Sequence, residues 1–232
     1  MNTRTNASEL IIRQRLAALK RALPAATAGD VTAIHQARVA TRRLREALPL
    51  VVSGSSKRKL ERIVRKLTRA LGPVRELDVA NLMLDDFAAV HEAPRAGAVR
   101  LQQFVRDERQ RLHGDLVRSI ERGDIDKLAR KAIAVAQRHD HAMAGKRPVR
   151  DPRQLDRARR RAARRALRLR AAIENAAASY LPDRLHQVRI AVKKLRYAME
   201  IANELSGSRA TAKLLALKRA QDLLGRMHDL EV

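Results

Sequence analysis

The sequence contains no cysteine and very few aromatic residues. Without cysteine, the chain has neither a disulfide framework nor a thiolate zinc site. Its four aromatic residues are Phe87, Phe104, Tyr180 and Tyr197. So small a set is too sparse for the base-stacking platform with which many proteins hold single-stranded nucleic acid.

Long hydrophobic runs are also missing. No run of about 18 apolar residues is present, and the N-terminus lacks the apolar core of a signal peptide. We therefore expect no membrane-spanning helix, and the composition predicts a soluble cytoplasmic protein.

Acidic residues are outnumbered two to one. The chain of 232 residues has 50 Lys and Arg against 25 Asp and Glu, which gives a net charge of +25. Such an excess repels itself in the folded state, and its usual counterpart is a polyanion: a nucleic acid, an anionic membrane or a phosphate polymer. The basic segments carry no Trp or Phe anchors, so binding to a membrane surface is disfavoured.

Composition and turn residues predict an all-α fold. Ala, Leu, Arg, Glu and Lys dominate the sequence and favour helices. No Asn-Gly or Asp-Gly pair separates alternating runs in the manner of a β-hairpin. Helix boundaries follow from Gly, Pro and capping residues. The predicted helices are 7–23, a helix capped by Asp30 or Thr32, 56–71, a segment to about Val90 after a break or kink at Gly72–Pro73, a helix from Pro94 to a break at Gly123–Asp124, another to about Met143, 153–178, a helix introduced by Pro182, and a last helix ending near Gly225.

Two stretches of the chain are nearly the same. Residues 34–48 and 185–199 are identical at seven of fifteen positions, and a second pair, 71–79 and 224–232, follows at nearly the same offset. The offsets of 151 and 153 residues are too long for a solenoid repeat. They predict a duplicated helical bundle with internal pseudo-twofold symmetry. Because the second copy stops at Val232, its bundle is expected to lack the last helix.

The repeat also predicts the domain organisation. Residues 1–232 are expected to form a single domain. Its parts are a first half-repeat at about 7–91, connecting helices at about 94–145 and a second half-repeat at about 153–232.

Each repeated helix carries a stripe of cations beside its apolar face. At about 100° per residue, one arc holds a histidine and three cations, roughly one helical turn of 5.4 Å apart. The arc contains His35, Arg38, Arg42 and Arg45 in the first copy and His186, Arg189, Lys193 and Arg196 in the second. The core stripe beside the first arc consists of Ile34, Ala37, Thr41, Leu44 and Leu48. Arginine suits a linear phosphate polymer because its planar fork binds two oxygens at once.

Two features of the stripes leave alternatives open. His35 and His186 can donate to phosphate, but a structural hydrogen-bonding role is the alternative for both. Glu46 lies in the first arc and can pair with Arg42 at i,i+4, which would weaken that stripe.

Further basic residues lie outside the two stripes. A third set is Arg65, Lys66 and Arg69 with Lys218 and Arg219. A possible secondary face is formed by Arg157, Arg161, Arg164 and Arg168, for which a merely solvated helix face is the stronger alternative.

The doubled pattern resembles a known family. Each copy reads His-x-x-Arg-(Val/Ile)-x-x-(Lys/Arg)-(Lys/Arg)-Leu-Arg, followed by Leu-Gly-x-x-x-acidic-Leu-acidic-Val. This pattern is similar to that of the CHAD family, the conserved histidine α-helical domain, and spans nearly the whole chain. The resemblance implies two four-helix bundles related by pseudo-twofold symmetry. It also implies binding of inorganic polyphosphate in a basic central groove, and an association with polyphosphate granules.

The resemblance also implies site residues. Those expected to bind polyphosphate are His35, Arg38, Arg42, Arg43, Arg45, Arg65, Lys66, Arg69, Arg75, His186, Arg189, Lys193, Lys194, Arg196, Lys218 and Arg219. Acidic positions of the family are matched by Glu76, Asp78, Asp229 and Glu231, which are expected to orient the basic residues. Glu76 stands where Asp is more usual.

Two other functions are weighed against polyphosphate binding. A metal-dependent phosphohydrolase would need a site such as His35, His186 and Asp78. Neither histidine has a second histidine or a carboxylate at i+3 or i+4, so we expect no enzyme, metal or cofactor. Nonspecific nucleic-acid binding is the stronger alternative because of the net charge, although no helix-turn-helix or zinc motif offers a reading head.

Overall fold

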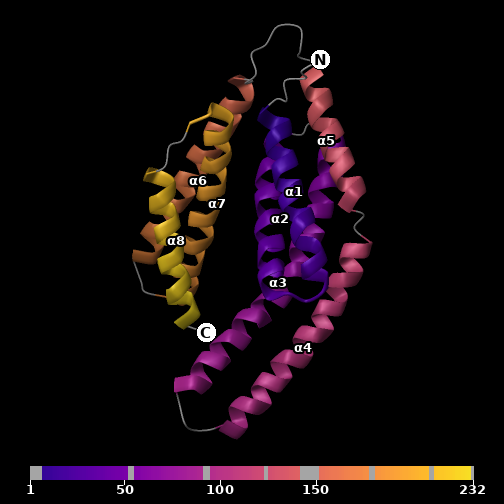
Figure 1. The fold of residues 1–232 in the computed structure, drawn as a ribbon. Helices are drawn as coiled ribbons and strands as arrows, with labels where there is room; N and C mark the ends of the chain where they lie inside the picture. The colour runs from indigo at the N-terminus through magenta and orange to yellow at the C-terminus, as the bar shows by residue number, and fades with distance from the viewer. Residues whose placement is uncertain are drawn as a thin grey trace. The chain divides into compact units, whose positions relative to one another are not determined.

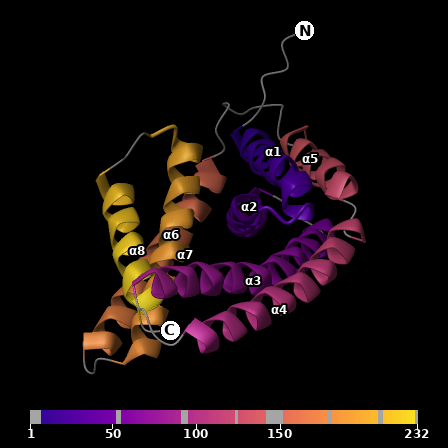
Figure 2. The same cartoon turned by 60° about the horizontal axis from the view of Figure 1, so that its bottom comes forward.

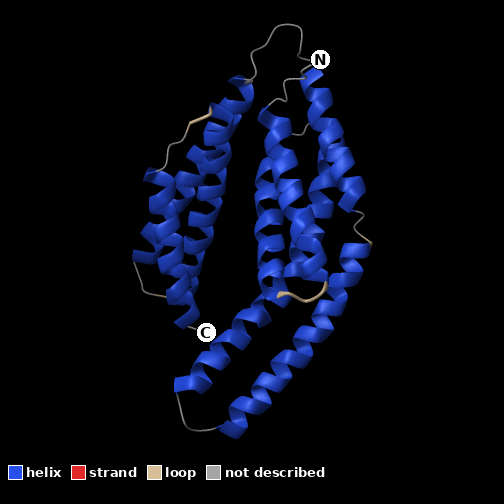
Figure 3. Ribbon diagram, in the orientation of Figure 1, coloured by secondary structure: helices blue, strands red, loops and turns tan. Residues whose placement is uncertain are grey.

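The protein is all-α, as predicted. The computed structural model describes residues 7–51, 55–90, 95–122, 125–141, 152–177, 181–208 and 212–230. These residues form eight helices and no strand (Figures 1 and 3). The helices are α1 (Ala7–Thr27), α2 (Val31–Val51), α3 (Ser55–Val90), α4 (Arg95–Glu121), α5 (Ile125–His141), α6 (Pro152–Ala177), α7 (Pro182–Ser206) and α8 (Ala212–Leu230).

The chain divides into two compact units, each with one copy of the repeated motif. The first-copy unit is Ile12–His139, in which α3 pairs with both α2 and α4. The second-copy unit is Met1–Ile11 with Asp140–Val232, in which α7 pairs with both α6 and α8. The same order of a motif helix followed by its packing partner thus occurs in both units. The pseudo-twofold relation between two bundles and the predicted half-repeat limits stay predictions.

Helix α2 begins and packs as its sequence predicts. Of the two predicted caps, Asp30 is the one used, since its Oδ1 atom accepts a hydrogen bond of 2.6 Å from the backbone N–H of Ala33. Gly29 before it has a positive φ of 93°, which only glycine adopts without cost. The predicted core stripe of α2 is confirmed, because all five of its residues are buried. The five are Ile34, Ala37, Thr41, Leu44 and Leu48.

Helix α3 has no break at Gly72–Pro73, where the sequence predicts either a break or a kink. It is one helix of 36 residues that continues through Pro73 (Figure 2). Proline removes one backbone donor, but Pro73 is exposed, so water can satisfy the freed carbonyl. Figure 1 shows that α3 bends partway along its length, between the part beside α2 and the part that continues along α4.

Two other predicted helix ends are also wrong. Helix α1 passes through Pro24 to Thr27, and α8 passes through Gly225 to Leu230. Propensity alone marked these residues as breaks, whereas tertiary packing carries the helices beyond them. The predicted end near Met143 lies outside the described residues.

Charges are segregated along α3. Its first half carries seven cations against Glu61, whereas residues 76–90 carry four carboxylates and no Lys or Arg. The cations are Lys57, Arg58, Lys59, Arg62, Arg65, Lys66 and Arg69, and the carboxylates are Glu76, Asp78, Asp85 and Asp86. The basic half lies along α2, and the acidic half continues along α4.

A buried ion pair fixes α4 on α3. The Asp78 side chain has no exposed surface, and its Oδ1 atom lies 2.6 Å from Nε of Arg109. The Nη2 atom of Arg109 also donates a 2.8 Å hydrogen bond to the carbonyl of Gly29. Arg109 therefore ties α3, α4 and the turn between α1 and α2 together, and positions the basic face of α2 and α3.

Candidate polyanion-binding surface

The first basic stripe lies beside the core of α2, as its periodicity predicts. His35 and Arg45 are exposed, whereas Arg38, Arg42 and Arg43 are half-buried. Half-burial holds the stems of the arginines against apolar surface and leaves their guanidinium groups near water. The stripe is therefore more ordered than a row of cations on a fully solvated helix.

Four arginines of α2 and α3 form one cluster. Partial loss of water around the Arg45 guanidinium lowers its pKa from the ordinary value, and the charge of Arg65 lowers it further. Arg42 and Arg69 act in the same direction, while Glu46 raises the pKa. Coulomb effects of this kind require short distances. Arg42, Arg65 and Arg69 therefore lie near Arg45, on the packed helices α2 and α3, and we call these four residues the four-arginine cluster.

The four-arginine cluster is not neutralised by salt bridges. Within the part of the chain that the structure describes, none of the four arginines makes an ion pair, and Glu46 is the acidic residue whose charge reaches them. The i,i+4 pair of Arg42 with Glu46 that the sequence allows is not formed. Uncompensated like charges at short range are unfavourable unless an anion joins them.

Arg38 bridges the same two helices at the edge of the cluster. Its Nη2 atom lies 3.3 Å from Oε1 of Glu76, and its side chain is only 21% exposed. This contact fits the expected orienting role of Glu76. Two other predicted site residues of α3 differ in burial, since Lys66 is exposed and Arg75 is half-buried.

Asp78 is expected to orient the basic residues of the site, but it pairs with a cation outside the two stripes. Its partner is Arg109, a residue that the sequence analysis did not select. The sequence does indicate that Asp78 is buried, because Asp78 continues the spacing of the apolar residues Leu71 and Val74 on α3. A buried carboxylate needs a partner. The spacing did not reveal which cation would meet it. Asp229 and Glu231, the acidic positions of the second copy, lie outside the residues whose side chains are described.

The second stripe lies on α7. His186, Arg189, Lys193 and Arg196 are half-buried, and Lys194 is exposed. A Cβ atom added to Gly225 would lie 3.8 Å from Nη2 of Arg189, so Arg189 reaches α8 at this glycine. The counterpart of Gly225 in the first copy is Gly72. Arg38 contacts α3 at Glu76, four residues after Gly72. The two motif copies are thus built alike at this position.

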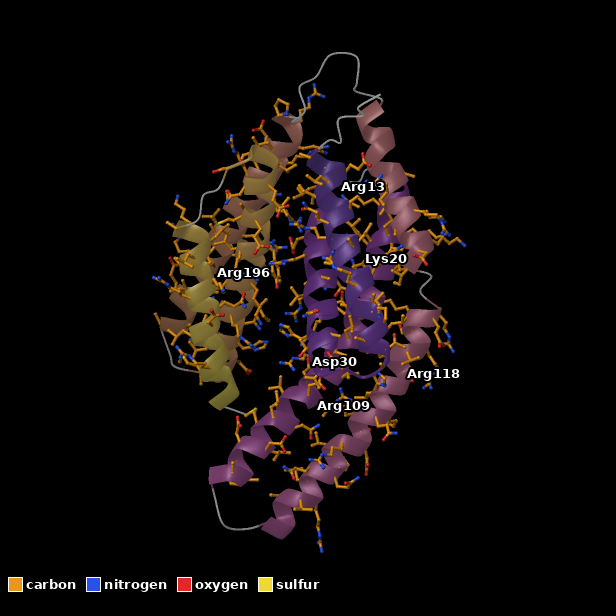
Figure 4. All side chains as sticks on the ribbon, viewed as in Figure 1. Arg13, Lys20, Asp30, Arg109, Arg118 and Arg196 are labelled. Atoms are coloured by element: carbon orange, nitrogen blue, oxygen red, sulfur yellow. The ribbon has the colours of Figure 1, made fainter. Side chains whose placement is uncertain are left out.

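Arg196 is held by several groups in its own unit. It forms an ion pair with Glu200 one turn along α7, and its Nε atom donates a 3.0 Å hydrogen bond to Gln221 on α8. Its guanidinium lies 4.6 Å from the centre of the Tyr197 ring. Figure 4 labels Arg196 on the second-copy unit and Arg109 on α4. The predicted α8 cations, Lys218 and Arg219, are exposed.

The secondary face on α6 resembles a solvated helix surface. Arg157, Arg164 and Arg168 are exposed and Arg161 is half-buried. Nearby, Arg170 lies 3.5 Å from Glu174 in an exposed i,i+4 pair. Such pairs contribute little to stability. The arrangement agrees with the solvated-face alternative for these arginines.

Neither a metal-ligand cluster nor a membrane-spanning helix is found among the described residues. Their side chains include no group of three His, Asp or Glu residues that could hold a metal ion. Asp78, one member of the hypothetical metal site, is already occupied by Arg109. None of the described helices is long and apolar enough to cross a membrane.

Comparison with known proteins places the chain in a family. The model of the CHAD domain matches residues 10–232, so the chain belongs to the CHAD family. The crystal structure of the CHAD domain from the plant Ricinus communis is similar with a TM-score of 0.71 and 26% identity, over 97% of this chain and 74% of that one. A structure of PptA from Streptomyces chartreusis has a TM-score of 0.66 and 17% identity, over 96% and 81% of the two chains, and shows the fold alone. Among curated proteins, none matches significantly.

Proposed function

We propose that the chain binds inorganic polyphosphate through the basic faces of its two repeated helices, as a non-catalytic binding or targeting module. The observation that carries this proposal is the four-arginine cluster of Arg42, Arg45, Arg65 and Arg69. The other three arginines lie close enough to Arg45 to lower its pKa, and none of the four has an ion-pair partner in the described part of the chain.

A phosphate polymer satisfies such a cluster better than a single anion. Each arginine offers a fork of donors that fits two phosphate oxygens. Cations on two neighbouring helices can hold successive phosphates of one chain. Because the polymer has no bases, it needs no aromatic platform and no base-reading helix, neither of which the sequence provides.

Nonspecific binding of nucleic acid is the second candidate, supported by the net charge of +25. Phe87 and Phe104 are exposed aromatic residues of the kind that stack on bases, but Phe87 lies on the acidic half of α3. Its 18 residues of separation from Arg69 correspond to about 27 Å along the helix. The cluster and Phe87 therefore do not form one nucleic-acid surface.

A competition experiment separates the two candidates. Long-chain polyphosphate and single-stranded DNA of equal total charge are titrated against a labelled polyphosphate at near-physiological salt. We expect polyphosphate to displace the label at a concentration at least tenfold lower than DNA. Equal displacement by the two polymers would favour a nonspecific polyanion binder.

Substitution tests the location of the site. Arg42→Ala combined with Arg69→Ala is expected to weaken polyphosphate binding about tenfold or more, since each removes a charged hydrogen-bond donor. The matched control removes the same charge from α6, with Arg157→Ala and Arg164→Ala. A similar loss in both variants would mean that net charge, and not the cluster, governs binding.

The non-catalytic and targeting roles have their own tests. Incubation of the protein with polyphosphate of defined length, with and without divalent metal ions, is expected to leave the length distribution unchanged on a gel. In cells that form polyphosphate granules, a fluorescent fusion is expected to gather on them. The same fusion carrying Arg42→Ala and Arg69→Ala is expected to spread evenly.

A further inference from the structure

The two copies of the motif differ in charge at equivalent positions. With offsets of 151 residues for α2 and α7 and 153 for α3 and α8, the cluster residues Arg42, Arg45 and Arg65 correspond to cations in the second copy. These cations are Lys193, Arg196 and Lys218. The fourth residue, Arg69, corresponds to Asp222, so the charge is reversed there.

The equivalent arginines also differ in their partners. Arg196 forms an ion pair with Glu200 and donates to Gln221. The corresponding positions around Arg45 are Pro49 and Thr68, which supply no carboxylate and no amide. Among the residues that the structure describes, Arg45 makes no ion pair, and three other arginines lie near it.

Burial makes the Arg196 pair hard to displace. The side chains of Arg196 and Glu200 are only 13% and 17% exposed, so solvent screens their attraction less than that of a surface pair. A phosphate that binds Arg196 must compete with Glu200 and with the hydrogen bond to Gln221. A phosphate that binds Arg45 displaces no such partner and relieves the repulsion among the four arginines.

We propose that the two motif copies are unequal, and that the four-arginine cluster of the first copy is the primary polyphosphate site. The inference rests on the proposed function and adds which copy supplies the affinity. In the first copy, four arginines are accompanied by Glu46. In the second copy, the three corresponding cations are accompanied by two carboxylates, Glu200 and Asp222, so this set carries a net charge of +1 against +3 for the first-copy set.

Matched double variants test the inequality. Arg45→Ala with Arg65→Ala is compared with Arg196→Ala with Lys218→Ala, so that equivalent positions lose equal charge. Polyphosphate affinity is measured by calorimetry at fixed salt. The first variant is expected to lose about tenfold or more in affinity and the second less than about threefold. An equal loss in both, or a larger loss in the second, would overturn the inference.

A gain of affinity provides a test that does not depend on removing a packed side chain. Asp222 is exposed, and Asp222→Arg restores the charge found at Arg69. The control is Asp86→Arg, an equally large charge change at an exposed position on the acidic half of α3. Asp222→Arg is expected to raise polyphosphate affinity severalfold above Asp86→Arg. An equal effect of the two substitutions would contradict compensation at Asp222.

The outcomes distinguish this inference from the proposed function. If the unchanged protein binds polyphosphate no better than single-stranded DNA, the proposed function fails. If it prefers polyphosphate but the matched double variants lose affinity equally, only the inequality of the two copies fails. Circular dichroism melting of each variant identifies any loss of affinity that comes from unfolding.

Discussion

The Nη2 atom of Arg38 lies 3.3 Å from the Oε1 atom of Glu76, and this contact joins the motif helix α2 to α3. Glu76 is 70% exposed, so the pair is largely screened by water. Its main effect is to hold the Arg38 guanidinium beside the basic surface. In the second copy, Arg189 approaches Gly225 of α8, about one helical turn before the position that corresponds to Glu76.

Glu76→Gln tests this relationship. The amide keeps an acceptor for Arg38 while removing one negative charge. The free energy of unfolding in urea is expected to change by less than about 1 kcal/mol. Polyphosphate affinity at low salt is expected to rise by up to about fivefold. Glu174→Gln on α6 removes the same charge as a control, and an equal rise there would show that Glu76 has no local effect.

Asp78→Asn tests the buried ion pair with Arg109. The substitution leaves the Arg109 charge without its carboxylate, and such a loss costs about 3 to 5 kcal/mol of folding free energy. The control, Asp86→Asn, removes an exposed carboxylate of the same helix and is expected to change stability by less than about 0.5 kcal/mol. Urea unfolding measures both. Similar small effects would show that the Asp78–Arg109 pair does not fix α4 on α3.

Leu44→Ala tests the core behind the basic stripe. Leu44 is fully buried on α2, and truncation of such a leucine costs about 3 kcal/mol or more because a cavity remains. Leu82→Ala on α3 is the control, since Leu82 is half exposed. If the two substitutions destabilise the protein equally in urea, the assigned apolar face of α2 is wrong.

The contact between α1 and α5 predicts a shift in one acid pKa. A hydrogen bond from Lys20, and then its charge, hold the pKa of Asp126 below its ordinary value. A depressed folded-state pKa stabilises the fold above the unfolded-state value of about 3.9, and this contribution is lost as pH falls through the folded pKa. An NMR titration of Lys20→Met should show the Asp126 pKa moving back up. Lys131→Met, which removes an exposed cation from the same helix α5, is expected to leave it in place.

Binding should depend little on pH between about 6 and 8. The residues of the four-arginine cluster stay charged throughout this range, even with the lowered pKa of Arg45. Polyphosphate affinity measured at constant ionic strength is therefore expected to vary less than about threefold. A steep loss of affinity as the pH rises through about 6.5 would instead show that protonated histidine, at His35 or His186, is required.

Composition was sufficient for the class of fold, and sequence periodicity for the faces of α2. Its apolar stripe was predicted residue by residue, because a spacing of three and four residues fixes which side of a helix is buried. Prolines and glycines were less informative. Pro24 and Gly225 are predicted to end helices, and Gly72–Pro73 to break or kink one, but each of these residues lies within a helix, because packing on neighbouring helices outweighs local propensity.

The sequence predicted which basic residues belong to the candidate site, but not which side chains they contact. The repeat identified Arg42 and Arg45, and a separate basic run contained Arg65 and Arg69, yet only the structure brings the four together. The difference between Arg45 and Arg196 depends on neighbours across a helix pair, at Gln221 in the second copy, and on Glu200 one turn away. Such side-chain contacts depend on distances between packed helices, which cannot be read from the sequence.

The order of charges along α3 has a consequence for the lifetime of the protein. A helix is stabilised by acidic residues near its N-terminus and basic residues near its C-terminus, and α3 carries them in the opposite order. A polyanion bound at the basic half supplies the missing negative charge, and by mass action it stabilises the folded chain. Because cellular proteases act on opened molecules, a chain that binds a polyanion as proposed should become more abundant when the cell supplies more of that polyanion.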